Sequence, residues 1–311
     1  MTAVTVTPRR PPWHRRRSTI GMLYATPITV FVLLLFVLPL IMVVVMSFSD
    51  WKLIGGFQGI NFPDNYAEPA NEAGIAYGVL NDPNLFNAIG FTIKYTVLVT
   101  VIMLALALGL ALIVQEATRW NAILRTAILI PSALGLASSS LLFYGLYTPA
   151  YGPINPALLF LGIVDKPVSF LGSPDSALLS TVVLIVWRYT GFYMLLLLVG
   201  LQSISSDVYE AARIDGAGRW QMFRSITLPL LRPSIAMSVI LCVTGSLLAF
   251  DQFFILTRGG PDGSTMTLVQ LIYFEAFGRQ DLGTAASFSV LVLIALVVLN
   301  TAQFRALRAR D

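Results

Sequence analysis

Six long apolar runs, separated by more polar segments, constrain the fold of this 311-residue chain more than any other feature. A helix needs about 20 apolar residues to cross the hydrocarbon core of a bilayer, and each run is close to or above that length. We therefore expect spans at 21–48, 88–114, 122–146, 177–201, 234–256 and 284–302, with Pro131 kinking the third. Only 12% of the residues are charged and the mean hydropathy is +0.77, which excludes an ordinary soluble domain. The predicted fold class is an all-α integral membrane protein with six transmembrane helices.

Basic residues are unevenly distributed between the segments that join these runs. Arginine is concentrated in the N-terminal tail, the turn at 116–126, the loop at 203–232 and the C-terminal tail. The loops on the opposite side hold only Lys52, Lys166, Arg258 and Arg279. Because cytoplasmic segments carry the excess of lysine and arginine, both termini are predicted to be cytoplasmic. The predicted organisation is a disordered basic tail at 1–19, a six-span domain at 20–305 and a cytoplasmic tail at 306–311.

The segment at 203–233 is the most polar passage between two long apolar runs. Asp207 followed by Glu210 has the form of a capping box, which predicts a helix starting at Asp207. Gly216 is expected to end that helix, since glycine adopts a left-handed backbone without steric cost. A second short helix is expected at 219–226, until Pro229 prevents an ordinary continuation. The two helices are expected to lie against the membrane as a helix–turn–helix, with Trp220, Met222 and Phe223 available to a partner.

The same segment resembles the EAA loop of ATP-driven, binding-protein-dependent importers. Glu210-Ala211-Ala212, Gly216 after three further residues, and then Ile226, Leu228 and Pro229 match that loop without a gap. The alternative is an ordinary amphipathic loop between spans. The resemblance implies the permease fold of type I importers and a coupling helix that docks into a cleft on a cytoplasmic ATPase. It assigns this coupling role to Glu210, Ala211, Ala212, Asp215, Gly216, Phe223, Leu228 and Pro229.

A second stretch of similarity narrows the branch of this family. Thr257-Arg258-Gly259-Gly260-Pro261, Ile272-Tyr273, Ala276-Phe277 and Leu282-Gly283 resemble the sugar and glycerol-phosphate permeases. The similarity covers roughly residues 20 to 305. It implies a multi-pass protein of the bacterial cytoplasmic membrane and, as the solute, a carbohydrate or a related polar molecule of the oligosaccharide, amino sugar or glycerol-phosphate type.

The partners and cofactors follow from the same resemblance. It implies a second permease subunit that completes the pore, a dimer of ATPase subunits and an extracytoplasmic solute-binding protein. No G-x-x-x-x-G-K-[ST] pattern occurs, so ATP and Mg²⁺ are expected on the ATPase, and this chain is expected to be non-catalytic and to bind no cofactor. His14 and Cys242 are the only residues of their types, which argues against a metal site. The arginines flank apolar spans, so nucleic acid is not an expected partner.

Three ionisable residues lie inside the predicted spans, where burying a charge is costly and usually functional. Lys94 is close enough to the outer end of its span to reach water. Arg188 and Asp251 lie deeper in the fourth and fifth spans. Two alternatives remain open for them: a structural pair that joins the two spans, or two groups that grip a polar ligand.

The resemblance also suggests where the solute passes. In maltose-type relatives a Trp-containing segment before the EAA loop, and a stretch of the next span, line the sugar site. Because this sequence has Arg188 and Asp251 there, an anionic or amino-bearing ligand is a further possibility. The predicted pathway residues are Trp187, Arg188, Tyr189, Phe192, Tyr193, Asp251, Gln252 and Phe253.

Two other classes of protein compete with the importer subunit. A secondary, ion-coupled six-span transporter normally needs titrating groups within the membrane, and three scattered charges without a histidine suit it poorly. A membrane-embedded enzyme is disfavoured because the sequence offers no metal cluster, paired carboxylates or nucleophile with a base. The sequence favours the importer subunit.

Overall fold

A computed structural model describes residues 17–67 and 78–308. The predicted disordered tail at 1–19 therefore lies outside the described residues, except for 17–19, where the first helix begins. At the other end the last helix reaches residue 308, so the predicted tail at 306–311 starts as helix.

Four spans are uninterrupted helices, as the first, second, fourth and sixth apolar runs predict. The first span combines α1 (Arg17–Val32), a π turn (Leu33–Val37) and α2 (Leu38–Ser47). The other three are α4 (Pro83–Ile113), α8 (Pro174–Gln202) and α15 (Leu282–Arg308). The N-termini of α4 and α8 carry side-chain caps, since the backbone N–H of Asn84 donates to Asp82 and that of Ser176 donates to Ser173.

The third and fifth spans are broken: the kink predicted at Pro131 is confirmed, whereas the prediction of a continuous helix at 234–256 is wrong. The third consists of α5 (Arg119–Leu129), a 3₁₀ turn (Ile130–Ala133) and α6 (Leu136–Tyr147), with a bend of 94°. Pro131 lies in that turn, and a proline has no N–H to continue the helix. In the fifth, α12 (Arg232–Leu247) ends before α13 (Asp251–Leu256) begins. Among the described residues, four helices are long and apolar enough to cross a membrane. The number rises to six if two bent pairs are each one span: the third span, and Arg219–Leu230 with Arg232–Leu247, which are bent by 63°.

The fold is mostly helical rather than strictly all-α. A hairpin of β1 (Ser49–Lys52) and β2 (Gly56–Ile60) follows the first span, and Gly55 and Gly56 have the positive φ angles that its turn requires. Short helices occupy the connecting segments: α3 (Asp64–Ala67), a 3₁₀ turn (Val79–Asn81), α7 (Ile154–Phe160) and α14 (Leu268–Tyr273), which continues into a π turn (Phe274–Gly278).

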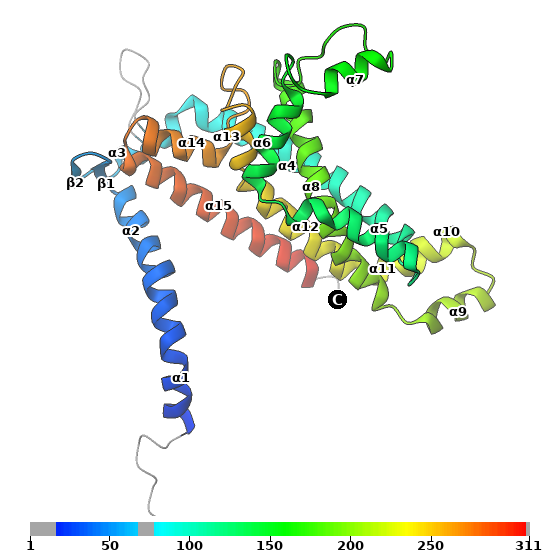
Figure 1. The fold of residues 1–311 in the computed structure, drawn as a ribbon. Coiled ribbons are helices and arrows are strands. Elements are labelled where there is room, and N and C mark those ends of the chain that lie inside the picture. The colour runs from blue at the N-terminus through cyan, green and yellow to red at the C-terminus, as the bar shows by residue number, and fades with distance from the viewer. Residues whose placement is uncertain (1–16, 68–77, 309–311) are drawn as a thin grey trace, which may run out of the picture.

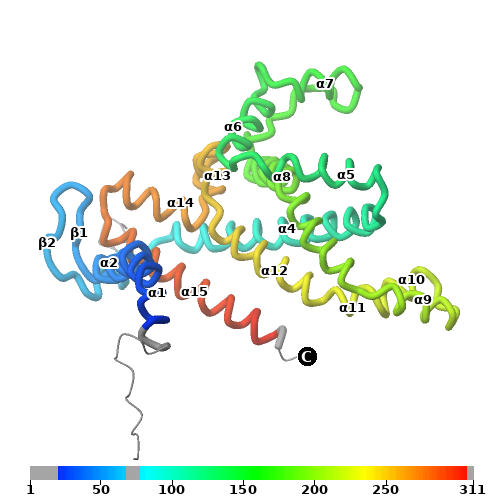
Figure 2. Tube along the Cα trace, turned by 60° about the horizontal axis from the view of Figure 1, so that its bottom comes forward, coloured from blue at the N-terminus to red at the C-terminus, as the bar shows by residue number. Residues whose placement is uncertain are grey.

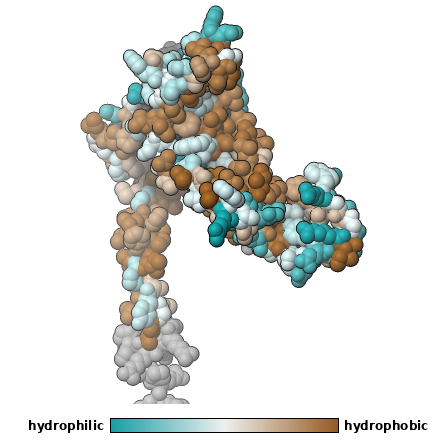
Figure 3. All heavy atoms as spheres, turned by 45° about the vertical axis from the view of Figure 1, so that its right-hand side comes forward, coloured by the Kyte–Doolittle hydropathy of each residue, from teal (hydrophilic) through white to brown (hydrophobic). Residues whose placement is uncertain are grey.

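The core lies between α4 and α8, with α12 packed against both (Figures 1 and 2). Met103 of α4 and Leu184, Met194 and Leu197 of α8 belong to this core, and all four are fully buried. The first span contacts α15 through its C-terminal half, α2, and otherwise stands apart, and none of its most apolar 18-residue window is buried. Apolar side chains cover this span and much of the bundle (Figure 3), as expected for surfaces that face lipid or another subunit.

Candidate functional site

The predicted coupling segment forms a pair of short helices that projects from one end of the bundle (Figure 1). They are α9 (Ser206–Ile214) and α10 (Arg219–Met222), followed by a π turn (Phe223–Thr227) and α11 (Leu228–Leu230). The predicted capping box at Asp207 is wrong, because Ser205 is the N-cap and its hydroxyl accepts from the N–H of Asp207 at 3.3 Å. Helical structure also runs through Pro229, since the wide turn before it lets the chain continue in α11.

The turn between α9 and α10 depends on Gly216, as the sequence predicts. Its φ angle is +79°, in the left-handed region. The N–H of Ala217 donates to the carbonyl of Ala212 at 2.9 Å, which satisfies the end of α9. Ala212 is buried, whereas the neighbouring coupling residues Glu210, Ala211 and Asp215 are exposed.

Exposed apolar side chains lie on the same helix pair. Ile214 is 86% exposed and Trp220 is 71% exposed. The hydroxyls of Tyr209 and Thr227 are 3.1 Å apart and connect α9 to the π turn, so the two arms of the segment are held together. A polar segment with large apolar side chains turned outward has the character of a docking surface.

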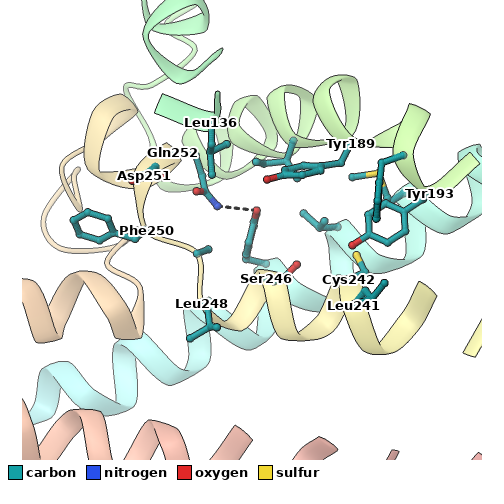
Figure 4. Close-up of a pocket in the computed structure, with 17 residues that line it drawn as sticks. Leu136, Tyr189, Tyr193, Leu241, Cys242, Ser246, Leu248, Phe250, Asp251 and Gln252 are labelled. Carbon is teal, nitrogen blue, oxygen red and sulfur yellow. Dashed lines mark hydrogen bonds between the residues drawn. The ribbon is translucent and has the colours of Figure 1, made fainter. Parts of the chain in front are cut away.

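A cavity of about 330 Å³ lies where the break in the fifth span meets α4, α6 and α8 (Figure 4). The break brings Leu248, Ala249 and Phe250 to its wall, and the Thr267 hydroxyl donates to the carbonyl of Ala249 at 2.7 Å. Irregular backbone at membrane depth is tolerated where it lines a cavity in this way. The wall consists of Tyr95, Val99, Met103, Leu136, Ile185, Tyr189, Phe192, Tyr193, Leu241, Cys242, Gly245, Ser246, Leu248, Ala249, Phe250, Asp251 and Gln252.

The structure brings five of the eight predicted pathway residues to this cavity: Tyr189, Phe192, Tyr193, Asp251 and Gln252. Trp187, Arg188 and Phe253 do not line it. Phe253 is fully buried, with its ring 5.0 Å from that of Phe91 and 4.9 Å from that of Tyr95.

Sequence reasoning missed Tyr95 and Ser246. Tyr95 follows Lys94 in the second apolar run. An aromatic residue next to a charged one within a span was the sequence feature that could have identified it. Ser246 lies on α12 one turn after Cys242, whereas Phe250 reaches the wall at the break in the fifth span, which the apolar pattern does not predict.

Arg188 is turned away from the cavity. Its Nε donates to the carbonyl of Leu134 at 3.0 Å, and the Ser132 hydroxyl donates to the carbonyl of Arg188 at 2.7 Å. The guanidinium lies 4.2 Å from the centroid of the Tyr189 ring. Among the described residues no ion pair joins Arg188 to Asp251, so the predicted alternative of a structural pair is not formed.

Polar groups at one end of the cavity are left free to bind a solute. The Gln252 Nε2 donates to the Tyr95 hydroxyl at 3.1 Å, while the Gln252 Oε1 is buried without a hydrogen-bond partner. Asp251 is half-buried beside it. Figure 4 shows Phe250, Asp251 and Gln252 at one end, with Tyr193 and Cys242 at the other. Aromatic faces with a few polar groups are suited to a polar solute that also has apolar faces.

A second cavity of about 430 Å³ opens at the N-terminal ends of α4 and α8. Lys94 lies on its wall and forms an ion pair of 2.9 Å with Asp175. Both side chains are largely exposed, so the lysine reaches water as expected. In the described part of the chain no three His, Cys, Asp or Glu residues are grouped as metal ligands.

A bundle of apolar spans around a polar-aromatic cavity, with a docking segment at one end, defines a membrane-transport subunit. The chain belongs to the family of binding-protein-dependent transport system inner membrane components, whose model matches residues 15–310. It is a multi-pass permease subunit of an importer in the plasma membrane.

Three relatives illustrate this membership. The trehalose/maltose transport system permease protein MalF of Thermococcus litoralis is 36% identical over 219 residues, covering 69% of this chain and 73% of that protein. The sulfoquinovosyl glycerol transport system permease protein SmoG of Agrobacterium fabrum is 30% identical, covering 94% and 91%. A chain of a bacterial alginate ABC transporter has the same fold, with a TM-score of 0.76 at 20% identity over 94% of this chain and 95% of that one.

Proposed function

We propose that this subunit forms half of the translocation pathway for a carbohydrate or a related polar solute in an ATP-driven importer. The observation that carries the proposal is the cavity at the broken fifth span, where Tyr189, Phe192 and Tyr193 face the free groups of Asp251 and Gln252. Sugar rings stack on aromatic faces, and their hydroxyls need hydrogen-bonding groups of this kind. The relatives named for trehalose/maltose and for sulfoquinovosyl glycerol transport support a sugar-type solute.

The second half of the pathway belongs to another permease subunit. The first span exposes apolar side chains on every face and contacts the bundle only at α15, so it has surface for such a partner as well as for lipid. A binding protein would deliver the solute at the end that carries the hairpin and α14. The opposite end, where α1 begins and α15 ends, is then cytoplasmic, as the arginine distribution indicates.

The energy comes from a separate ATPase dimer that binds ATP and Mg²⁺, while this chain is non-catalytic. The helix pair α9–α10 docks on that ATPase through Glu210, Phe223 and the exposed apolar side chains. The remaining coupling residues, Ala211, Ala212, Asp215, Gly216, Leu228 and Pro229, shape the segment. Hydrolysis moves the docked pair, and the spans follow as rigid bodies between inward-open and outward-open states.

Vesicle transport tests the proposal. The complete transporter, with its binding protein, is reconstituted in proteoliposomes with ATP and Mg²⁺ on the side of the ATPase. Candidate sugars are first screened for binding to the binding protein, and the ones that bind are supplied as radiolabelled solutes. Uptake is expected only with hydrolysable ATP. Uptake that persists on an ion gradient after ATP is exhausted would instead show a secondary transporter.

A further inference from the structure

The cavity has an uneven distribution of charge. Of the described residues that line it, Asp251 alone carries a charged side chain. It has no ion-pair partner in that part of the chain. It lies at the start of α13, where the interrupted span exposes it to the cavity. Any solute in the cavity therefore meets an unneutralised carboxylate.

Arg188 does not supply the missing positive charge. Its guanidinium donates to the Leu134 carbonyl, which is not part of the cavity wall, and is covered by the ring of Tyr189. Lys94, the nearest lysine along α4, is occupied by Asp175 at the outer end. Neither Arg188 nor Lys94 lines the cavity, although the Nη1 of Arg188 is buried without a hydrogen-bond partner.

We infer that the Asp251 carboxylate selects solutes by charge, admitting neutral and amino-bearing saccharides and rejecting phosphorylated, sulfonated or carboxylated ones. A carboxylate accepts hydrogen bonds from sugar hydroxyls and strong ones from an ammonium group. A second anion in the same apolar cavity meets Coulomb repulsion that water screens poorly. The inference deepens the proposed function, because it names the charge class of the solute, and it rests on that function only for the statement that the solute is a sugar.

Thiol labelling tests the charge selection without knowledge of the natural solute. Gly245 lines the cavity, and a Cβ at this position meets no atom within 4 Å, so Gly245→Cys places a reactive group there without strain. Cys242 is the only native cysteine, and Cys242→Ser removes it from the background. Three methanethiosulfonates serve as probes, carrying an aminoethyl, a hydroxyethyl or a sulfonatoethyl group. The rate at which each reagent modifies the introduced thiol is measured in vesicles that contain the assembled transporter. It is divided by the rate at which the same reagent modifies 2-mercaptoethanol, which corrects for the intrinsic reactivity of the reagent.

The cationic reagent is expected to react about tenfold faster than the anionic one, with the neutral reagent between them. In Asp251→Asn this ratio should fall to about one, while the rate of the neutral reagent stays the same and shows that the cavity is intact. Asp175→Asn removes a carboxylate that does not line the cavity, and it should keep the original ratio. An anionic reagent as fast as the cationic one, or a ratio that Asp251→Asn leaves unchanged, overturns the inference. So does a Gly245→Cys thiol that none of the reagents modifies.

The labelling needs neither ATP nor a binding protein. A preserved reagent ratio in a transporter without ATP-driven uptake would therefore count against the proposed function and leave the charge selection standing. ATP-driven uptake of a carboxylated or phosphorylated sugar, unchanged in rate by Asp251→Asn, would support the proposed function and count against the charge selection.

Discussion

The Nε of Arg188 donates a hydrogen bond of 3.0 Å to the carbonyl of Leu134, across the break in the third span. That carbonyl lies at the end of the 3₁₀ turn, where no helical N–H is available to it. The Ser132 hydroxyl in the same turn donates a hydrogen bond to the carbonyl of Arg188. Arg188 therefore fixes the bend that places Leu136 in the wall of the cavity, and it acts on the cavity through the backbone.

Arg188→Met is expected to lower the stability of the protein by about 1.5–3 kcal/mol, because a buried hydrogen bond from a charged group is lost. Thermal unfolding of the purified transporter checks this. Lys94→Met is the matched control, since its exposed ion pair with Asp175 contributes about 0–1 kcal/mol. If Arg188→Met unfolds at the wild-type temperature but changes solute affinity, Arg188 contacts the solute and the positioning role is wrong.

Gly191 permits the closest approach between α8 and the third span. A Cβ at this position would lie 2.8 Å from the Cα of Leu129 and against the carbonyl group of Ile128. Because these are backbone atoms, they cannot move aside cheaply, and Gly191→Ala should destabilise the protein by about 1–3 kcal/mol. Gly109→Ala in α4 meets no atom within 4 Å and should be neutral or slightly stabilising. The unfolding temperature is expected to fall in Gly191→Ala and to stay the same or rise slightly in Gly109→Ala. An equal change in both variants would contradict the close contact at Gly191.

The sequence predicts the uninterrupted spans well and the broken ones poorly, for identifiable reasons. Hydropathy detects a run of apolar residues but not a bend within it. Pro131 predicts the break in the third span, whereas no residue at 248–250 predicts the break in the fifth. That second break is stabilised by a hydrogen bond from the Thr267 hydroxyl to the carbonyl of Ala249, and Thr267 lies in a later segment of the chain. The coupling turn was predictable because the positive φ of Gly216 is a local requirement.

The cavity was predictable only in part. The resemblance located Tyr189 and Asp251, but which face Arg188 presents depends on the carbonyl of Leu134 in another span. That bond is a consequence of the bend, and sequence spacing contains no information about it.

Glu275 is expected to make stability depend on pH. It lies outside the spans and is 1% exposed, and burial raises its pKa. The nearby Arg279 lowers that pKa, while Asp82 and Asp281 raise it, and the net direction is upward from 4.5. The native state therefore binds this proton more tightly than the unfolded state, so the contribution of Glu275 to stability is present at low pH and is lost as pH rises through its native pKa.

Thermal unfolding from mildly acidic to neutral pH measures this dependence. The contribution of Glu275 to the slope of unfolding temperature against pH should disappear in Glu275→Gln. Asp175→Asn changes a side chain that is 82% exposed and should keep the wild-type slope. A wild-type slope in Glu275→Gln would show that other groups are responsible.

Gly216 gives the sharpest test of the coupling segment. Its φ of +79° costs any other L-residue about 1–2 kcal/mol, so Gly216→Ala is expected to open the turn between α9 and α10. Gly218, two residues on, begins α10 in an extended conformation with φ −72° and meets no atom near its Cβ, so Gly218→Ala is the matched control. In proteoliposomes, Gly216→Ala should lower the amount of solute imported per ATP hydrolysed several-fold, while Gly218→Ala keeps the wild-type ratio. Because the altered turn lies outside the bundle, the unfolding temperature of the spans should stay unchanged in both variants. Equal import per ATP in Gly216→Ala and the wild type would mean that the α9–α10 pair does not transmit the movement of the ATPase.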